Sequence, residues 1–502
     1  MATGGNVRLD SAAGRWVLAA TVLGSAVAML TGTVVNVALP ALGTALQAGT
    51  EELQWILNGY LLALASLILI GGSLGDRYGH RRMFVVGTAW FAVASILCAL
   101  APDVRWLIGF RVLQGIGAAL LLPESLAIIE AVFHPDDRGR AIGAWSALGG
   151  IAAAVGPLLG GWLIDLTGWR SVFLLVLPLT AVVIAVGLAR IPRTPTRDGE
   201  SLDVAGASTA FLALGLLTYA LVRGSGEGFG QPLVIAAGLI GFAALLAFLA
   251  IEARVEHPMV PLTMFADRLF AAGNAVTFVV YAALGGSFFL LVVYLQVGLG
   301  YSALAAGASL LPITALMLAL SARAGQYAQD HGSRVPLTLG PLLAAAGLAL
   351  MATIDPGESY WVSTFPAVAV FGLGLATTVA PVTSTVLGAA PEGREGAASG
   401  INNAVSRTAQ LAAVAIFPAV AGLAGGSMGD RDAMLAGFPR AALAMAAVAA
   451  LGGLLGWTLI RPQPGALEAR PDAGVGRACR HCALDGTPLA VRGDGGADGR
   501  AA

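Results

Sequence analysis

Two charged residues interrupt long apolar runs and are the strongest candidates for chemistry. Glu124 stands in the run Leu121-Leu122-Pro123-Glu124-Ser125-Leu126, and Arg111 precedes it in the same apolar region. An acidic group at the centre of a membrane helix costs about 2.5 to 3.5 kcal/mol, so it is rarely kept without a use. Low-dielectric surroundings favour the neutral acid, which makes Glu124 a candidate proton carrier that also attracts cationic compounds. The alternative is a structural acid near the inner end of the helix that pairs with Arg or caps the break at Pro123.

The spacing of these two charges separates them along one helix. Their offset corresponds to about 20 Å of rise and about 220° of rotation, so the carboxylate and the guanidinium cannot pair directly. Arg111 therefore needs other partners, and Gln114 or backbone carbonyl groups would make it a buried structural cation.

The composition identifies the environment of these charges. Of 502 residues, 57% are hydrophobic and only 11% are charged, whereas soluble domains are about one quarter charged. This excludes an ordinary soluble enzyme, and it excludes a disordered chain, which is poor in apolar residues. The net charge of −1 argues against a nucleic-acid partner, because such proteins carry a basic patch. We therefore expect an integral membrane protein.

Apolar runs of about 18 or more residues mark the expected membrane spans. We count about 14 of them, which predicts an all-α integral membrane fold with about 14 transmembrane helices and both termini on one side. The runs begin near Trp16, Leu53, Met83, Trp106, Ala141, Val172, Val204, Leu233, Ala271, Ala303, Pro336, Trp361, Val405 and Ala441.

The distribution of Arg residues predicts which side the termini occupy. With both termini in the cytoplasm, about 22 Arg residues lie on the inner side or at inner helix ends. We therefore expect a multi-pass protein of the cell (plasma) membrane with both termini cytoplasmic. The few Arg residues left outside are Arg105, Arg170, Arg223, Arg431 and Arg440.

Short connections and a weak internal repeat predict two related halves. The segment Gly72–Gly79 after the second run is echoed by Ala324–Gly332 after the tenth, and duplicated halves around a midplane site are typical of secondary transporters. The predicted organisation is a cytoplasmic lead (1–15), an N-terminal six-helix bundle (16–190), two linking helices with a cytoplasmic loop (191–270), a C-terminal six-helix bundle (271–460) and a flexible cytoplasmic tail (461–502).

The loop from Gly72 to Arg82 combines small residues with several charges. Its glycines permit a tight turn, and Asp76 can accept hydrogen bonds from Arg groups or from a helix N-terminus. Taken alone, the loop also fits a merely basic connection that obeys the positive-inside rule.

Four segments resemble signatures of the major facilitator superfamily and of its 14-span drug and proton antiporter group. The loop Gly72–Arg82 resembles motif A, Arg111–Gly117 resembles motif B, Gly156–Gly161 resembles motif C, and Leu30–Pro40 is similar to the first-span signature. They stand in the family's order and, with weaker matches, cover the chain up to about Arg461.

The resemblance implies an alternating-access transporter that exports hydrophobic, often cationic, compounds in exchange for protons. It implies a role for Arg111 in proton handling. It also implies an inner-gate motif, with its polar latch at Asp76 and Arg77, and a hinge motif in the fifth span. Pro157 removes one backbone hydrogen bond there, so the helix can bend, although the glycines equally fit close packing. The inner-gate residues are Gly72, Asp76, Arg77, Gly79, Arg81 and Arg82, and the hinge residues are Gly156, Pro157, Gly160 and Gly161.

The sequence departs from the family pattern where an acidic residue usually follows Leu30. Thr31 stands there and does not titrate in the working range. Either another residue carries the proton that is coupled to transport, or proton coupling is absent. Glu124 is the visible replacement. A milder departure is Ala152, where the extended motif C usually has Gly. Candidates to line a central cavity, which are equally suited to bond between helices, are Thr31, Thr33, Asn36, Tyr60, Gln114, Asn274 and Gln296.

The remaining polar residues predict little chemistry. Cys479 and Cys482 offer too few ligands for a zinc site, and the five His residues are scattered over loops and tail. A chain without Lys has no phosphate-binding loop of the Gly-x-x-x-x-Gly-Lys kind. Asp203, Asp330 and Arg407 are placed at inner helix ends. We expect no cofactor, no metal ion and no enzyme activity.

The sequence therefore predicts proton-coupled export of lipophilic drugs or antibiotics by a chain that can act as a monomer. Its expected partners are a hydrophobic small molecule, protons and membrane lipid. The alternatives are an exporter of a specific endogenous metabolite or lipid, a transporter without proton coupling, and a membrane receptor or scaffold. Substrate identity depends on cavity shape and a few side chains, which spacing does not reveal.

Overall fold

The computed structural model describes residues 7–193, 203–255, 258–391, 394–423 and 427–461, and this part of the chain is helical. Its one isolated β-bridge joins Val7 to Phe133. The first helices are α1 (Ala12–Leu46), α2 (Thr50–Tyr78), α3 (His80–Leu100), α4 (Val104–Val132), α5 (Pro135–Thr167), α6 (Arg170–Leu174) and α7 (Val176–Arg190). Two further helices follow, α8 (Val204–Glu227) and α9 (Pro232–Glu252).

The second part of the chain repeats the pattern of long helices. Its elements are the short 3-10 helix η1 (Leu262–Ala266), α10 (Arg268–Val293) with the π-helical turn η2 (Tyr294–Gly298), α11 (Ala303–Ala308), α12 (Leu311–His331), α13 (Arg334–Met351), α14 (Thr364–Gly388), α15 (Glu395–Val420), η3 (Ser427–Gly429) and α16 (Arg431–Leu459).

Local sequence explains where several of these helices begin. Asp103, Asp267 and Asp430 precede α4, α10 and α16, and each carboxylate accepts backbone N–H groups of the first turn. Such caps satisfy donors that the helix itself cannot pair. The apolar interiors then continue as helices, because a helix satisfies its own backbone where water is absent.

Twelve helical segments of the described residues are long and apolar enough to cross a membrane. The apolar segment Val155–Thr167 of α5 is shorter, and α15 is not among the twelve; α15 carries the polar residues Asn402, Asn403 and Arg407 within its length. The protein is therefore an all-helical, multi-pass membrane protein with twelve candidate spans. The predicted count of about 14 helices stays a prediction.

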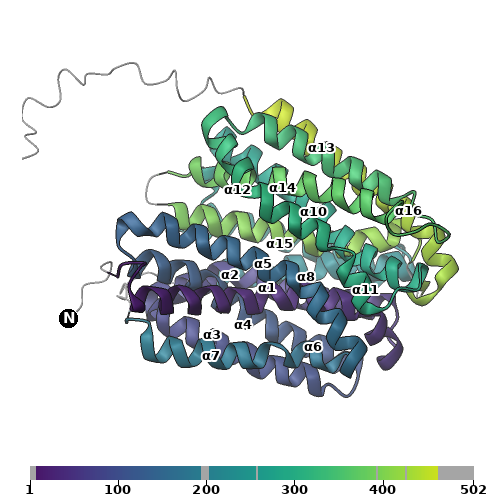
Figure 1. The fold of residues 1–502 in the computed structure, drawn as a ribbon, viewed down its shortest axis with the longest axis horizontal. Coiled ribbons are helices and arrows are strands. Elements are labelled where there is room, and N and C mark those ends of the chain that lie inside the picture. The colour runs from purple at the N-terminus through teal and green to yellow at the C-terminus, as the bar shows by residue number, and fades with distance from the viewer. Residues whose placement is uncertain (1–6, 194–202, 256–257, 392–393, 424–426, 462–502) are drawn as a thin grey trace, which may run out of the picture.

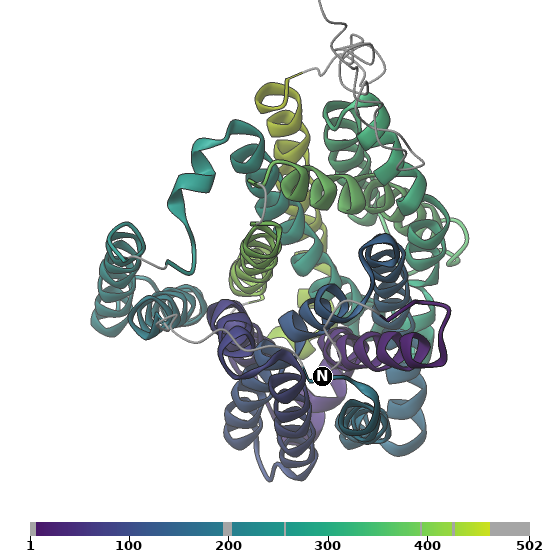
Figure 2. The ribbon, with the colours of Figure 1, turned by 90° about the vertical axis from the view of Figure 1, so that its left-hand side faces the viewer.

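The long helices form two groups, with a hairpin beside them. Helices α1–α7 contact one another in the first group and α10–α16 in the second, while α8 pairs with α9 and also contacts α2 and α15. Figure 1 shows the helices running along one direction, and Figure 2, which looks along them, shows the α8–α9 pair to one side. We call the two groups the first half and the second half.

The internal repeat seen in the sequence reappears in backbone geometry. Gly79 ends α2 with φ of 91°, and Gly332 ends α12 with φ of 90°. Both values lie in the left-handed region that glycine adopts without a steric penalty. The two echoing segments therefore form the same kind of turn between two helices in each half.

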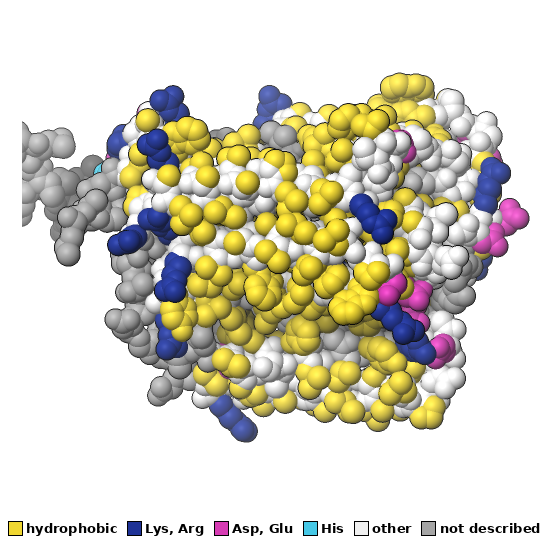
Figure 3. All heavy atoms as spheres, turned by 90° about the horizontal axis from the view of Figure 1, so that it is seen from below, with side chains coloured by type: hydrophobic (Ala, Val, Ile, Leu, Met, Phe, Trp, Pro, Cys, Tyr) yellow, Lys and Arg dark blue, Asp and Glu magenta, His cyan; other side chains and the backbone are white. Residues whose placement is uncertain are grey.

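The two ends of the bundle differ in charge. On the face in Figure 3, acidic side chains gather at one end, where some Arg side chains also lie, whereas Arg side chains predominate at the other end. We call the end that carries the α2–α3 and α4–α5 connections the basic end, and the end that carries the α1–α2 and α3–α4 connections the opposite end. Arg77, Arg81, Arg138 and Arg140 lie at the first, and Glu51 at the second.

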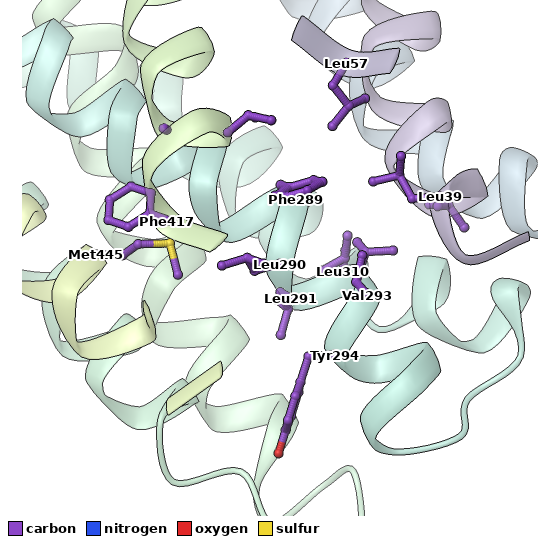
Figure 4. Packing of buried hydrophobic residues seen from close by; sticks show 14 of the residues in the cluster. Leu39, Leu57, Phe289, Leu290, Leu291, Val293, Tyr294, Leu310, Phe417 and Met445 are labelled. Carbon is purple, nitrogen blue, oxygen red and sulfur yellow. The ribbon is translucent and has the colours of Figure 1, made fainter. Parts of the chain in front are cut away.

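Among the residues described, the largest cluster of buried apolar residues spans both halves, and its first-half members lie toward the opposite end. The largest cluster takes its first-half members from 30–57, 98–107 and 169–173 and continues into the second half. The other buried apolar residues of the first half, nearer the basic end, form their own cluster, with partly buried Ala404 of α15 against it. We call the first the shared apolar cluster; Figure 4 shows its members Leu39, Leu57, Phe289, Leu310, Phe417 and Met445.

Hydrogen bonds reinforce this junction. The Gln54 amide donates to the Val414 carbonyl at 2.8 Å, joining α2 to α15. Asp165 of α5 accepts from the backbone N–H groups of Ala303 (3.3 Å) and Leu304 (3.0 Å), the first residues of α11. The opposite end is thus closed by apolar packing and by polar contacts that cross between the halves.

Two carboxylates meet at the basic end of the α8–α9 hairpin. Asp203 caps α8 by accepting from Gly206 N at 2.7 Å, and Glu252 accepts from Val260 N at 2.9 Å. The second oxygens, Asp203 Oδ2 and Glu252 Oε1, are buried without a hydrogen-bond partner. They lie 2.5 and 2.9 Å from the position that a Cβ would take on Gly206. The two free oxygens therefore face nearly the same point, with no donor between them.

This geometry predicts that Glu252→Gln raises the thermal stability of the protein. A Gln keeps the acceptor for Val260 and adds an N–H donor for the unpaired Asp203 oxygen, a gain on the order of 1 kcal/mol. Thermal unfolding of the purified protein in detergent measures it, with exposed Glu358→Gln as the matched control. A fall in the midpoint for Glu252→Gln alone would contradict the facing arrangement.

Candidate functional site

Glu124 is fully buried in α4 and is bonded to a histidine. Its Oε2 lies 2.7 Å from Nδ1 of His80, the first residue of α3. The other ring nitrogen of His80 lies 3.6 Å from Asp76 Oδ1, at the end of α2. We call Asp76, His80 and Glu124 the His80 cluster. Three helices thus bring two carboxylates to opposite sides of one imidazole.

The turn between α2 and α3 positions this cluster. Gly79, with its positive φ, lets α3 begin directly after α2, so Asp76 and His80 stand four residues apart on one side of the turn. Gly75 faces the Glu124 carboxylate so closely that a Cβ there would overlap it. The small residues of the loop therefore create the space into which the acid of α4 fits.

The cluster can hold a proton without leaving an isolated charge. A proton shared between Glu124 and His80 makes either a neutral acid beside a neutral ring or an ion pair, and both keep the short hydrogen bond. Glu124 Oε1 is buried and has no partner, so the carboxylate is satisfied on one side only. Burial favours the forms with least net charge, and the group can therefore change its proton content together with its surroundings.

The structure places the predicted inner-gate residues unequally. Asp76 is near His80, whereas exposed Arg77 lies over the Tyr78 ring at 5.5 Å. Arg81 donates to the Leu188 carbonyl and so ties α3 to α7. Arg82 is exposed, and Gly72 lies beside Pro123 of α4.

Sequence reasoning missed His80. It assigned this residue to a loop with the other histidines, yet it begins α3 and is the direct partner of Glu124. The usable signal was its position four residues after Asp76 across a glycine turn, which is the spacing of neighbours on a helix face. The approach of α4 to that turn is a tertiary contact and left no mark in the local sequence.

Arg111 lies in a second polar cluster, away from Glu124. It is fully buried, its Nε donates to the Ile56 carbonyl at 2.9 Å, and its NH1 group donates to Gln114 Oε1. Gln114 in turn donates to Ser95 Oγ at 2.7 Å, and the guanidinium lies 4.4 Å from the Tyr60 ring centre. The predicted inability of Arg111 to pair with Glu124 agrees with these contacts, which join α2, α3 and α4.

The predicted hinge residues are contact points in this structure. The helix α5 runs without interruption through Pro157. A Cβ on Gly156 would overlap the Thr33 hydroxyl of α1, one on Gly160 would lie 2.6 Å from Val34, and one on Gly161 would overlap the Ala303 carbonyl of α11. These glycines let α5 approach both halves closely, and the hinge itself stays a prediction.

The cavity candidates divide into two groups. Four are buried in helix packing: Thr31 bonds to the Val27 carbonyl, Tyr60 to the Ala28 carbonyl, Gln114 to Ser95, and Asn274 to the Phe270 carbonyl while accepting from Asn402. Three are half-buried: Thr33 and Asn36 bond within α1, and Gln296 donates to the Val37 carbonyl across the halves at 3.0 Å.

Two further predictions concern the position of Arg407 and the cysteine pair of the tail. Arg407 is not at a helix end, because α15 begins ten residues earlier than the apolar run, at Glu395, so Arg407 lies near its middle. The apolar run begins only at Val405 because the residues before it are polar. The bundle nevertheless accommodates these polar residues within α15. Cys479 and Cys482 lie outside the described residues.

Long apolar helices in two halves with a repeated helix turn define a multi-pass membrane transporter of the secondary type. Residues 21–414 match the family model of the Major Facilitator Superfamily. The chain belongs to this superfamily, whose members are transporters and not enzymes.

Similar proteins support this assignment. The methylenomycin A resistance protein of Bacillus subtilis (strain 168) is 32% identical over 461 residues, which cover 91% of this chain and 96% of that protein. The tetracenomycin C resistance and export protein of Streptomyces glaucescens is 34% identical over 392 residues, 76% and 71% of the two chains. A solved bacterial homologue of the human lysosomal transporter Spinster, inward-facing and unoccupied, has a TM-score of 0.63 at 16% identity and covers 90% and 97%. This last likeness concerns the fold.

Proposed function

We propose that the protein exports lipophilic drugs or antibiotics across the plasma membrane by alternating access, in exchange for protons. The observation that carries the proposal is the asymmetric packing of the halves. They share the largest apolar cluster toward the opposite end, whereas the buried first-half residues nearer the basic end form their own cluster, which the second half contacts through partly buried Ala404. A conformation in which the two halves pack together at one end and can separate at the other is one state of an alternating-access cycle. The names of the two relatives, resistance to methylenomycin A and export of tetracenomycin C, favour antibiotic-like compounds.

We assign the basic end to the cytoplasm. This places both termini there and follows the positive-inside rule. The proposed organisation has about 14 spans, with six helices in residues 16–190, two linking helices within 191–270 and six in 271–460. In this assignment the closed opposite end faces outward, and the compound enters from the cytoplasm or the inner leaflet. The chain acts as a monomer, because each half already has its partner within it.

We assign proton coupling to the His80 cluster. Glu124 takes the place of the acid that is missing at Thr31, and His80 shares its proton. Because the cluster joins the α2–α3 turn to α4, a change of its proton content acts on the inner gate directly. Arg111 then serves coupling indirectly, by holding α4 against α2 and α3.

Proton release in liposomes tests the proposal. The purified chain is reconstituted with a pH-sensitive dye inside, a pH gradient is imposed, and a panel of lipophilic acids, neutral compounds and amines is added. We expect at least one compound to trigger proton movement that protein-free liposomes do not show. Transport of a compound without any proton movement would favour the uncoupled alternative, and response to one endogenous metabolite or lipid alone would favour a dedicated exporter.

A further inference from the structure

Arg407 is a charged residue in the middle of α15. The helix runs from Glu395 to Val420, so about 18 Å of helix lies on either side of it. Asn403 and Gln410 stand on the same face, one turn before and one turn after. The exposed apolar residues Ile416 and Val420 lie on the other side of the helix. The Arg407 face of α15 is therefore polar, whereas the side that carries Ile416 and Val420 is apolar.

Contacts along α15 show that the polar face points inward. Gly400 packs on Leu69 of α2, the Val414 carbonyl accepts from Gln54 of α2, and Gln410 packs on Gly285 of α10. These contacts bracket Arg407 along the helix. Arg407 thus lies where the two halves meet.

The guanidinium is poorly satisfied. One NH1 group donates to Gln410 Oε1 at 3.4 Å, while Nε is buried without an acceptor. Among the residues that the structure describes, no acidic side chain forms an ion pair with it. Arg111 differs, because two of its nitrogens have acceptors. An unpaired cation inside a membrane bundle is costly and indicates a functional site.

A second unpartnered group lies in the same seam. The α2–α15 contacts Gln54 to Val414 and Leu69 to Gly400 fix an antiparallel register in which Asn58 of α2 stands opposite residue 410, one turn from Arg407. Asn58 is fully buried, and neither its amide nitrogen nor its amide oxygen has a hydrogen-bond partner. Two unsatisfied polar side chains, one from each half, therefore stand on the facing helices α2 and α15, about one helical turn apart, near the middle of the bundle.

We propose that Arg407, assisted by Asn58, binds the carboxylate of an amphipathic organic acid, and that this acid is the class of compound transported. A guanidinium presents a planar pair of N–H donors that matches a carboxylate, and an amide adds one more donor. The acid of α4, which the sequence linked to cationic compounds, is bonded to His80 beside the α2–α3 turn, away from this seam, so it does not offer a counter-charge here. The inference rests on the proposed export function and narrows its substrate to anions.

Three probes that share one ring system test the charge preference. Naphthaleneacetate, its neutral amide and naphthylmethylamine are added to the purified full-length protein, and thermal stabilisation gives the affinity of each. We expect the acid to bind best. Better binding of the amine, or failure of the acid to bind, would overturn the inference.

Variants locate the binding group. In Arg407→Gln we expect the affinity for naphthaleneacetate to fall at least about tenfold, as for loss of a charged hydrogen bond, while amide binding stays the same. Arg407→Lys keeps the charge, so its affinity for naphthaleneacetate should lie between those of wild type and Arg407→Gln. Arg223→Gln, which removes a cation paired with Glu51 and Glu227 at the opposite end, is the control. Acid affinity within twofold of wild type in a folded Arg407→Gln protein would refute the site.

The result separates this inference from the proposed function. If amines but not acids drive proton movement in liposomes, export stands and the anion site is wrong. If no compound of any charge drives movement, the proposed function fails. Should Arg407→Gln not fold, the ranking of the three probes on wild-type protein and the Arg407→Lys affinity still decide the question.

Discussion

Glu124→Gln is expected to abolish compound-driven proton release in liposomes while compound binding persists. The substitution keeps size and hydrogen bonding toward His80 but removes the proton that the buried carboxyl group exchanges. Because this carboxyl group is fully buried and bonded to His80, an amide in its place leaves the cluster without its buried titratable acid. The release rate should fall to that of protein-free liposomes in the dye assay.

Two comparisons make this result specific. Glu227→Gln removes an acid that pairs with Arg223 at the opposite end and should leave coupling intact. His80→Gln should weaken coupling without abolishing it, because Glu124 remains able to bind a proton. If Glu124→Gln exchanged protons as well as wild type, the cluster would be a structural latch and the coupling group would lie elsewhere.

The second large effect is expected from Gly161→Val. A side chain at this position overlaps the Ala303 carbonyl, so α5 and α11 cannot keep their present approach. Overpacking of this kind costs about 1 to 3 kcal/mol, which corresponds to about 5- to 150-fold in the balance between two conformations. The protein should therefore spend far less time closed at the opposite end, and export should fall by a similar factor.

Thiol labelling measures this opening. Leu310→Cys places a thiol in the shared apolar cluster, where Leu310 is buried, in a background whose own cysteines are replaced by Ser. A membrane-impermeant reagent should label it slowly in the parent and much faster with Gly161→Val. Gly109→Val is the matched control, since a Cβ on Gly109 meets no atom within 4 Å. Equal labelling in all three proteins would mean that this contact does not hold the end closed.

Much of the helical architecture was predictable because membrane spans need long apolar runs. The runs near Val204 and Leu233 became α8 and α9 with nearly those starts. The prediction was less accurate at α15, where Gly, Ser and Asn residues of the first turns lower the hydropathy. One of these residues, Asn402, contacts Asn274 of α10 instead of lipid. A residue buried between helices does not need an apolar side chain. Hydropathy therefore predicts the start of such a helix several residues after its true start.

The candidate site was predictable only in its parts. A lone acid in an apolar run identified Glu124, and the partners of Arg111 were correctly sought in Gln114 and backbone carbonyls. The pairing of Glu124 with His80 depends on how α4 crosses the α2–α3 turn, which no local pattern encodes. The position of Arg407 between the two halves likewise depends on the register between α2 and α15. Long-range packing decided both.

Closure of the opposite end by the shared apolar cluster has a thermal consequence. Burial of apolar groups away from water is driven near 25 °C by the entropy of the solvent, and this drive weakens on cooling. The ionisable groups at the basic end follow proton concentration and ionic strength instead. The two ends of the molecule therefore respond to different physical variables, and the fraction of molecules closed at the opposite end is set in part by temperature.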